Sequence, residues 1–161
     1  MKNFCLILFF LIMQTVSAQN PATTTIYLIR HAEKADLSSN PELSDAGIKR
    51  AKNWAAYFEK TPIDLFYTTM YNRTQQTCSA IAATKQKDIL FYKPDAMDLK
   101  KIIAENQGKT LLIVGHSNTI PNYINKLLGA SKYEDIPESE FGNLYRITVT
   151  DEKISDELIH P

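Results

Sequence analysis

Three short apolar segments of the sequence each lead to a basic or imidazole side chain. They are 26–29 with Arg30 and His31, 65–68 with Arg73, and 110–114 with His116. Apolar strands of an open α/β sheet place the residues that follow them at the carboxyl edge, where such folds bind ligands. The sequence therefore predicts one site that contains two guanidinium and two imidazole groups.

These groups suit a phosphate ligand. A planar guanidinium donates two parallel hydrogen bonds to phosphate oxygens, so Arg30 and Arg73 are suited to hold a phosphate monoester. A neutral imidazole such as that of His31 can attack phosphorus and form a phosphohistidine, and His116 can donate a hydrogen bond to the phosphoryl group. Backbone N–H groups at the start of the helix after Ser117 and Asn118 add further anion binding.

A metal site is the competing interpretation of the two histidines. It needs a third nitrogen or carboxylate ligand, and two arginines at the same edge would repel a cation. The cysteines and histidines also lack the spacing of a zinc site. We therefore predict that neither a metal nor another cofactor takes part.

Four ordered motifs resemble those of the histidine phosphatase superfamily, with its phosphoglycerate-mutase-like fold, and specifically its small first branch. They are Arg30-His31-Ala32-Glu33, Leu43-Ser44-Asp45-Ala46-Gly47, the segment 67–77 that ends in Gln76-Thr77, and Gly115-His116-Ser117. The resemblance covers about residues 25–130. It implies that His31 is the nucleophile and that Arg30, Arg73 and His116 complete the phosphate site.

The resemblance also implies a carboxylic acid that protonates the leaving group, and this residue has no clear match. Members often carry it on the segment after the second arginine helix, where this chain has Asp88, Asp95 and Asp98. Asp95 and Asp98 are equally explained as helix caps. Glu33 is a further candidate by proximity, or it orients neighbouring groups.

The first 18 residues have the pattern of a cleavable export signal. Lys2 precedes an apolar run over 4–13, which is shorter than the roughly 20 residues that span a bilayer, and small side chains at Val16 and Ala18 precede the predicted cut. We expect 19–24 to be a linker and 25–161 a single histidine phosphatase domain. The mature protein would be periplasmic or secreted, with no membrane anchor.

The rest of the chain alternates predicted strands and helices. A first helix is expected from the cap at Ser44 to Pro62, with Ile48, Ala51, Ala55 and Phe58 facing inward. Further helices are expected over 72–84, around 99–103, and from Ser117 or Asn118 to about 128, and a hairpin over 144–159 closes the chain. This order predicts a three-layer α/β/α sandwich with a mainly parallel sheet. The acidic segment 131–140 could line the site's entrance, but we expect a solvated loop.

Charge limits the possible partners. The 161-residue chain has 18 basic and 18 acidic side chains, which argues against nonspecific binding of nucleic acid. We predict an exported, metal-independent phosphatase acting on a small-molecule phosphate ester. The alternatives are a noncatalytic module that binds phosphorylated ligands and, less favoured for so short an exported chain, a phosphomutase. The oligomeric state is not predicted.

Overall fold

A six-stranded mixed sheet forms the middle of the computed structural model, which describes residues 22–161. The strands are β1 (Thr24–Arg30), β2 (Leu65–Thr68), β3 (Ile89–Phe91), β4 (Thr110–Gly115), β5 (Leu144–Thr150) and β6 (Lys153–Ile159). Their order is β3-β2-β4-β1-β5-β6. The first four of these are parallel, and β5 and β6 are antiparallel at one edge, which confirms the predicted mainly parallel sheet.

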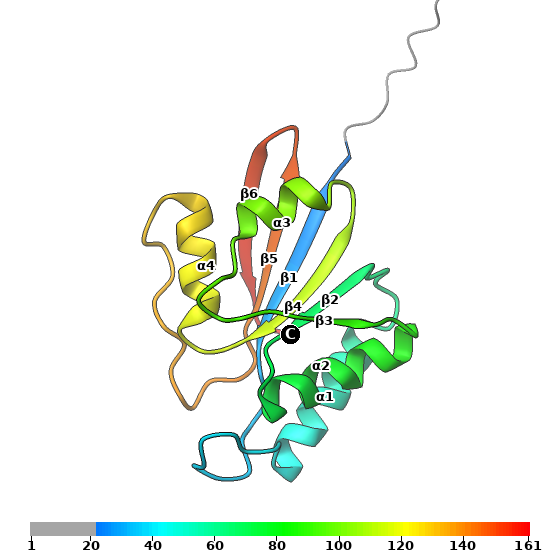
Figure 1. Cartoon of the computed structure of the whole chain (residues 1–161), viewed down its shortest axis with the longest axis vertical. Coiled ribbons are helices and arrows are strands. Elements are labelled where there is room, and N and C mark those ends of the chain that lie inside the picture. Colours follow the sequence, from blue (N-terminus) through cyan, green and yellow to red (C-terminus); the bar gives the residue numbers. More distant parts are fainter. Residues whose placement is uncertain (1–21) are drawn as a thin grey trace, which may run out of the picture.

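Two helices cover each face of the sheet (Figure 1). The helices are α1 (Asp45–Tyr57), α2 (Asn72–Lys85), α3 (Leu99–Glu105) and α4 (Thr119–Leu128). Helices α3 and α4 pack on one face and α1 and α2 on the other, which confirms the three-layer arrangement. None of the helices within 22–161 has the length and apolarity needed to cross a bilayer.

The central strands are apolar on both faces because each face is covered by helices. In β1, Ile26 and Leu28 contribute to the core under α3 and α4, whereas Ile29 contributes to the core under α1 and α2. In β4, Leu111 contributes to the core under α3 and α4, and Leu112 to the core under α1 and α2. Side chains alternate along a strand, so one short apolar segment supplies both layers.

Helix α1 begins as predicted and, apart from Ile48, buries the predicted face, since Ala51 and Phe58 are buried and Ala55 packs against the core. The Ser44 hydroxyl accepts a hydrogen bond from the Gly47 N–H at 3.1 Å, which caps the helix. Ile48, expected to face inward, is 45% exposed, while Trp54 is buried. The reason is the close approach of Gly47 to Glu33, since a Cβ atom at Gly47 would lie 2.3 Å from the Glu33 carbonyl oxygen. This contact turns the Gly47 side of α1 inward.

The C-terminal hairpin matches the prediction. Strand β5 pairs with β6 from Leu144 opposite Ile159 to Thr150 opposite Lys153. The connecting residues Asp151 and Glu152 both have positive φ, 48° and 64°, as a tight two-residue hairpin turn requires. The predicted export signal over 1–18 and the first half of the expected linker, 19–21, lie outside the described residues.

Candidate active site

The carboxyl ends of β1 and β4 lie side by side and place the two histidine segments together. The parallel register pairs Arg30 with Gly115, and the His31 N–H donates to the Gly115 carbonyl at 3.0 Å. Gly115 is tightly enclosed, since a Cβ atom there would lie 2.9 Å from the Tyr92 hydroxyl. The two imidazole rings consequently lie 5.6 Å apart between their centroids.

A hollow of about 310 Å³ opens at this edge of the sheet. Its lining residues are His31, Lys34, Tyr71, Arg73, Pro94, His116, Ser117, Asn118, Thr119 and Glu138. Five residues expected from the sequence therefore come together here, namely His31, Arg73, His116, Ser117 and Asn118. We call this hollow the site pocket.

His31 is held in the form needed for nucleophilic attack. Its Nδ1 lies 2.8 Å from the Ala32 carbonyl oxygen, and since a carbonyl can only accept, Nδ1 carries the proton and Nε2 keeps its lone pair. Burial is the main cause that lowers the pKa of His31 to about 3; the Ala32 hydrogen bond opposes this shift, and the charges of Arg30 and Arg73 add to it. The free protein thus presents a neutral imidazole at pH 7.

His116 is fixed by a pair of buried threonines. Its Nε2 lies 3.0 Å from the Thr69 hydroxyl, which lies 2.8 Å from the Thr74 hydroxyl. The Thr74 hydroxyl donates to the Tyr71 carbonyl at 2.8 Å, so Thr69 donates to Thr74 and accepts from His116 Nε2. Burial, followed by the charges of Arg73 and Arg30, lowers the pKa of His116 to about 4.

The two arginines differ in what they contact. Arg73 lies in the first turn of α2 and stacks on Tyr71, with its guanidinium carbon 4.5 Å from the ring centroid. Arg30 is only 1% exposed and does not line the site pocket. It lies against the segment 137–141, donating to the Pro137 carbonyl at 2.7 Å and the Glu140 carbonyl at 2.9 Å.

Both guanidinium groups keep a buried donor without a partner. Within the described chain, neither Arg30 Nε nor Arg73 Nε has a hydrogen-bond acceptor. Burial also lowers the pKa of Arg73, which remains a cation. Buried unpaired donors are uncommon in proteins, and an anion would supply the missing acceptors.

The Gln76-Thr77 pair connects the loop after β1 with α2. The Thr77 hydroxyl donates to the Arg73 carbonyl at 2.7 Å and accepts from the Ala32 N–H at 3.0 Å. The Gln76 side-chain oxygen accepts from the Leu43 N–H at 2.7 Å. These bonds fix the position of Arg73 relative to His31.

Glu138 is the site residue that sequence reasoning missed. Its carboxylate accepts from Arg30 at 2.9 Å and lies 3.4 Å from Lys34 Nζ, and it accepts from the Ser117 hydroxyl at 3.3 Å. Desolvation raises the pKa of Glu138, but Arg30 and Lys34 outweigh this effect and lower it overall. Residues 131–140 form the exposed loop that the sequence predicts, except that Ile136 is buried and Glu138 lines the site pocket, where it contacts Arg30.

The carboxylates expected as proton donors do not line the site pocket. Glu33 accepts from Arg50 at 2.6 Å; desolvation raises its pKa, but the bonds from Arg50 lower it overall. Asp98 caps α3 by accepting from the Lys100 N–H at 2.9 Å, and Asp88 and Asp95 are exposed. Among the described residues that line the pocket, Glu138 is the one carboxylate.

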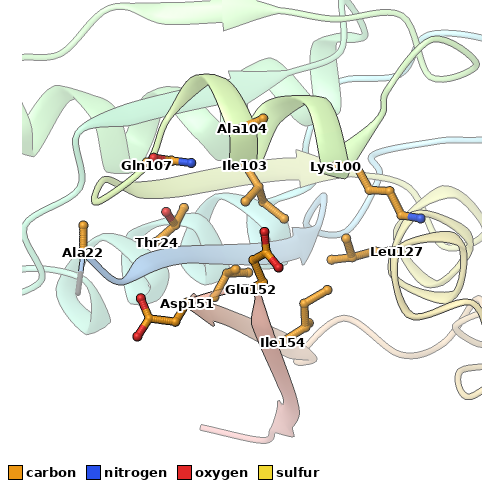
Figure 2. Close-up of a pocket in the computed structure, with 11 residues that line it drawn as sticks. Ala22, Thr24, Lys100, Ile103, Ala104, Gln107, Leu127, Asp151, Glu152 and Ile154 are labelled. Carbon is orange, nitrogen blue, oxygen red and sulfur yellow. The ribbon is translucent and has the colours of Figure 1, made fainter.

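Other features of residues 22–161 do not compete with this site. No group of three or more metal-binding side chains occurs there. A hollow of about 570 Å³ near the start of β1 is bordered by Ile103, Leu127 and Ile154, with the carboxylates of Asp151 and Glu152 beside it (Figure 2). Cys78 is buried, and burial raises the pKa of its thiol to about 12, so it is not a nucleophile.

Comparison with known proteins agrees with the motifs. Residues 26–93 match the model of the histidine phosphatase superfamily, branch 1. This segment includes Arg30, His31 and Arg73, and the structure adds His116 to them. Over these residues the chain is similar to the histidine phosphatase superfamily, branch 1.

Solved structures of three proteins show the same fold. A phosphoserine phosphatase from Entamoeba histolytica has a TM-score of 0.68 and 16% identity, and covers 83% of this chain and 94% of its own. The alpha-ribazole phosphatase from Shigella flexneri has a TM-score of 0.67 and 15% identity, with 85% and 96% covered. A protein from Agrobacterium tumefaciens described as the phosphohistidine phosphatase SixA has a TM-score of 0.60 and 21% identity, with 85% and 98% covered. No curated protein sequence matches the chain.

Proposed function

We propose that the protein is an exported phosphatase that hydrolyses small phosphate monoesters through a phosphohistidine on His31, without a metal ion. The observation that carries this proposal is the geometry of His31. Its Nδ1 is committed to the Ala32 carbonyl at 2.8 Å, and its Nε2 is free beside Arg73 and His116. The match of residues 26–93 to the family model, and the phosphatases named among the similar structures, support the same function.

The proposed reaction has two displacements at phosphorus. The Nε2 lone pair of His31 forms a P–N bond while the ester P–O bond breaks, and the leaving group departs with that electron pair and takes a proton from water. A water molecule then attacks phosphorus and gives a proton to the hydroxide left by the first step, the P–N bond breaks with its electron pair returning to His31 Nε2, and phosphate is released. Arg73 stabilises the charge on the phosphoryl oxygens in both steps. His116 contributes once the bound phosphate raises the pKa of its imidazole, so that Nδ1 takes up a proton and donates a hydrogen bond.

Arg30 would take part after a rearrangement at Glu138. In the structure its NH2 group is bound to the Glu138 carboxylate at 2.9 Å. An incoming phosphate dianion carries more charge than this carboxylate and would compete for the same guanidinium. The proposal therefore includes displacement of Glu138 when phosphate binds.

Hydrolysis of phenyl phosphate tests the proposed function. We expect the wild-type protein to be active in the presence of a chelator, and His31→Ala to lose at least about a thousandfold in kcat. His160→Ala is the matched control, because His160 is exposed and does not line the site pocket. Activity that His31→Ala retains, or that the chelator abolishes, would refute the proposal.

One observation favours the noncatalytic alternative, a module that binds phosphorylated ligands. The carboxylate that lines the pocket within the described chain, Glu138, has a lowered pKa and is poorly suited to protonate a leaving group. Tight binding of inorganic phosphate without turnover of phenyl phosphate would support this alternative. Turnover that depends on His31 excludes it.

Export is proposed from the sequence of residues 1–18. Cleavage after Ala18 would leave Gln19 as the first residue of the mature protein. N-terminal sequencing of the protein from an exporting host checks this, and an intact Met1 in the exported fraction would contradict it.

A further inference from the structure

A second hollow, of about 530 Å³, adjoins the site pocket. It shares Tyr71 and Pro94 with that pocket, and Met70, Phe91 and Tyr92 complete its apolar part. We call these five residues the apolar groove. Because the two hollows share two lining residues, a ligand whose phosphate lies in the site pocket can extend directly into the groove.

The groove exposes large apolar side chains. Met70 is 73% exposed, Phe91 54% and Tyr71 39%. These side chains come from the loop before α2 and from the end of β3, so the fold rather than sequence proximity brings them together. Contiguous exposed apolar surface of this kind commonly marks a ligand-binding groove.

Tyr71 connects the groove to the catalytic groups. Its ring stacks under the Arg73 guanidinium at 4.5 Å and meets the His116 ring edge-on at 5.2 Å between centroids. Both contacts hold the ring in place without a ligand. The Tyr71 ring therefore provides a rigid aromatic surface next to the phosphate-binding groups, where the leaving group of a bound ester would lie.

The charges around the groove distinguish among leaving groups. Its polar lining consists of Ser39, Asn40 and Lys93, with no carboxylate among the lining residues. The other side of the site pocket carries Lys34 and Glu138, which already contact each other. A cationic leaving group thus finds no partner in the groove, whereas a neutral ring finds apolar contacts.

We propose that the apolar groove binds the leaving group, and that the substrates are phosphate monoesters of phenols or alcohols that carry a flat, uncharged ring system. This inference rests on the proposed phosphatase function. Phenolate leaves without a proton from the enzyme. This fits the site pocket, because Glu138, the one carboxylate among its described lining residues, already contacts Arg30 and Lys34. The groove would add binding for the ring beyond the ester oxygen.

A pair of esters with phenols of similar acidity tests the inference. Phenyl phosphate and 4-phenylphenyl phosphate differ mainly in the second ring, which only the groove would bind. We expect kcat/KM to be about tenfold higher for the larger ester, the size of effect that apolar contacts in a pocket give. Equal kcat/KM values for the two esters would overturn the inference while leaving the phosphatase function intact, whereas hydrolysis of neither ester would overturn the phosphatase function.

Substitutions in the groove locate the effect. Phe91→Ser and Met70→Ser should each lower kcat/KM for the larger ester severalfold more than kcat/KM for phenyl phosphate, and so reduce the preference for the larger ester. Leu158→Ser is the matched control, because Leu158 is exposed on β6 at the opposite edge of the sheet from β3. Loss of both activities in equal proportion, or an unchanged preference in both groove variants, would overturn the inference.

Discussion

At the scale of single residues, the site depends on hydrogen bonds that fix which nitrogen of each histidine carries a proton. The Ala32 carbonyl assigns the proton of His31 to Nδ1, and the Thr69 hydroxyl assigns a proton of His116 to Nε2. Both imidazoles have lowered pKa values, to about 3 and about 4. At neutral pH the free protein therefore presents His31 with an unprotonated Nε2 and holds the His116 ring in one orientation.

Thr69→Val tests the positioning of His116. The hydroxyl that accepts from His116 Nε2 is lost while the side-chain shape is kept, so the ring loses its fixed orientation. We expect kcat for phenyl phosphate to fall about tenfold, corresponding to the loss of one buried hydrogen bond, with a smaller change in KM.

Thr68→Val is the matched control for this prediction. Thr68 is also fully buried, but its hydroxyl has no hydrogen-bond partner among the described residues. Its kcat should equal that of the wild type. A Thr69→Val enzyme that loses stability but keeps its kcat would show that Thr69 has only a structural role.

Glu138→Gln tests whether the carboxylate competes with phosphate. The amide is neutral, so Arg30 and Lys34 lose their anionic partner and become available to a ligand. We expect inorganic phosphate to inhibit severalfold more strongly, measured as a lower inhibition constant. Glu140→Gln should behave like the wild type, since Glu140 contacts Arg30 through its backbone carbonyl. A lower kcat with unchanged phosphate inhibition would instead identify Glu138 as a proton donor.

At the scale of elements, close backbone approaches decide how the helices meet the site. Gly47 lets α1 lie against the loop that follows β1, and Gly115 lets β4 end beneath Tyr92. Both glycines belong to the motifs that the sequence shows. Their role is steric, because a side chain at either position would separate the elements that carry the catalytic groups.

Gly47→Ala tests this packing. The added Cβ would lie 2.3 Å from the Glu33 carbonyl oxygen, so α1 or the segment around Glu33 must move. We expect the free energy of unfolding to fall by about 1–3 kcal/mol, measured by urea denaturation. Gly142→Ala is the control, since the nearest atom to its Cβ is 3.9 Å away. Equal stability of the two variants would contradict the steric role of Gly47.

Sequence reasoning predicted the elements well where a local signal exists. The apolar segments that end at Arg30 and His116 could be predicted as strands, because the apolar pattern alone indicates a buried strand and shows where it ends at the edge of the sheet. One position on the face of α1 was predicted wrongly, because Ile48 is exposed only through the contact between Gly47 and Glu33, which is distant in sequence. Glu138 was missed for the same reason, since only the fold brings it to Arg30.

In the molecule as a whole, the site residues at the ends of β1 and β4 are buried at the edge of the sheet rather than exposed on its surface. The exposed fractions of the Arg30, His31 and His116 residues are 1%, 4% and 9%. Such burial keeps the histidines neutral and makes the protein's stability depend on pH. The two terminal elements of the described chain, β1 and β6, also lie in this one sheet.

Stability should decrease as the medium becomes acidic. Both histidines have lower pKa values in the folded protein than their usual 6.5, so below that pH the unfolded chain binds protons that the folded protein does not. Their contribution is fully present above pH 6.5 and is lost as the pH falls toward about 3. Urea denaturation between pH 7 and 5 should show a smaller dependence on pH for the double variant His31→Asn, His116→Asn than for the wild type. An equal dependence would contradict the lowered pKa values.

The central claim is that His31 carries the phosphoryl group during turnover. Rapid mixing with radiolabelled phenyl phosphate, followed by quenching and peptide mapping, measures this directly. We expect an acid-labile phosphoenzyme with the label on His31, present in His160→Ala and absent in His31→Ala. Phenyl phosphate turnover without a labelled protein, or with the label on another residue, would contradict it.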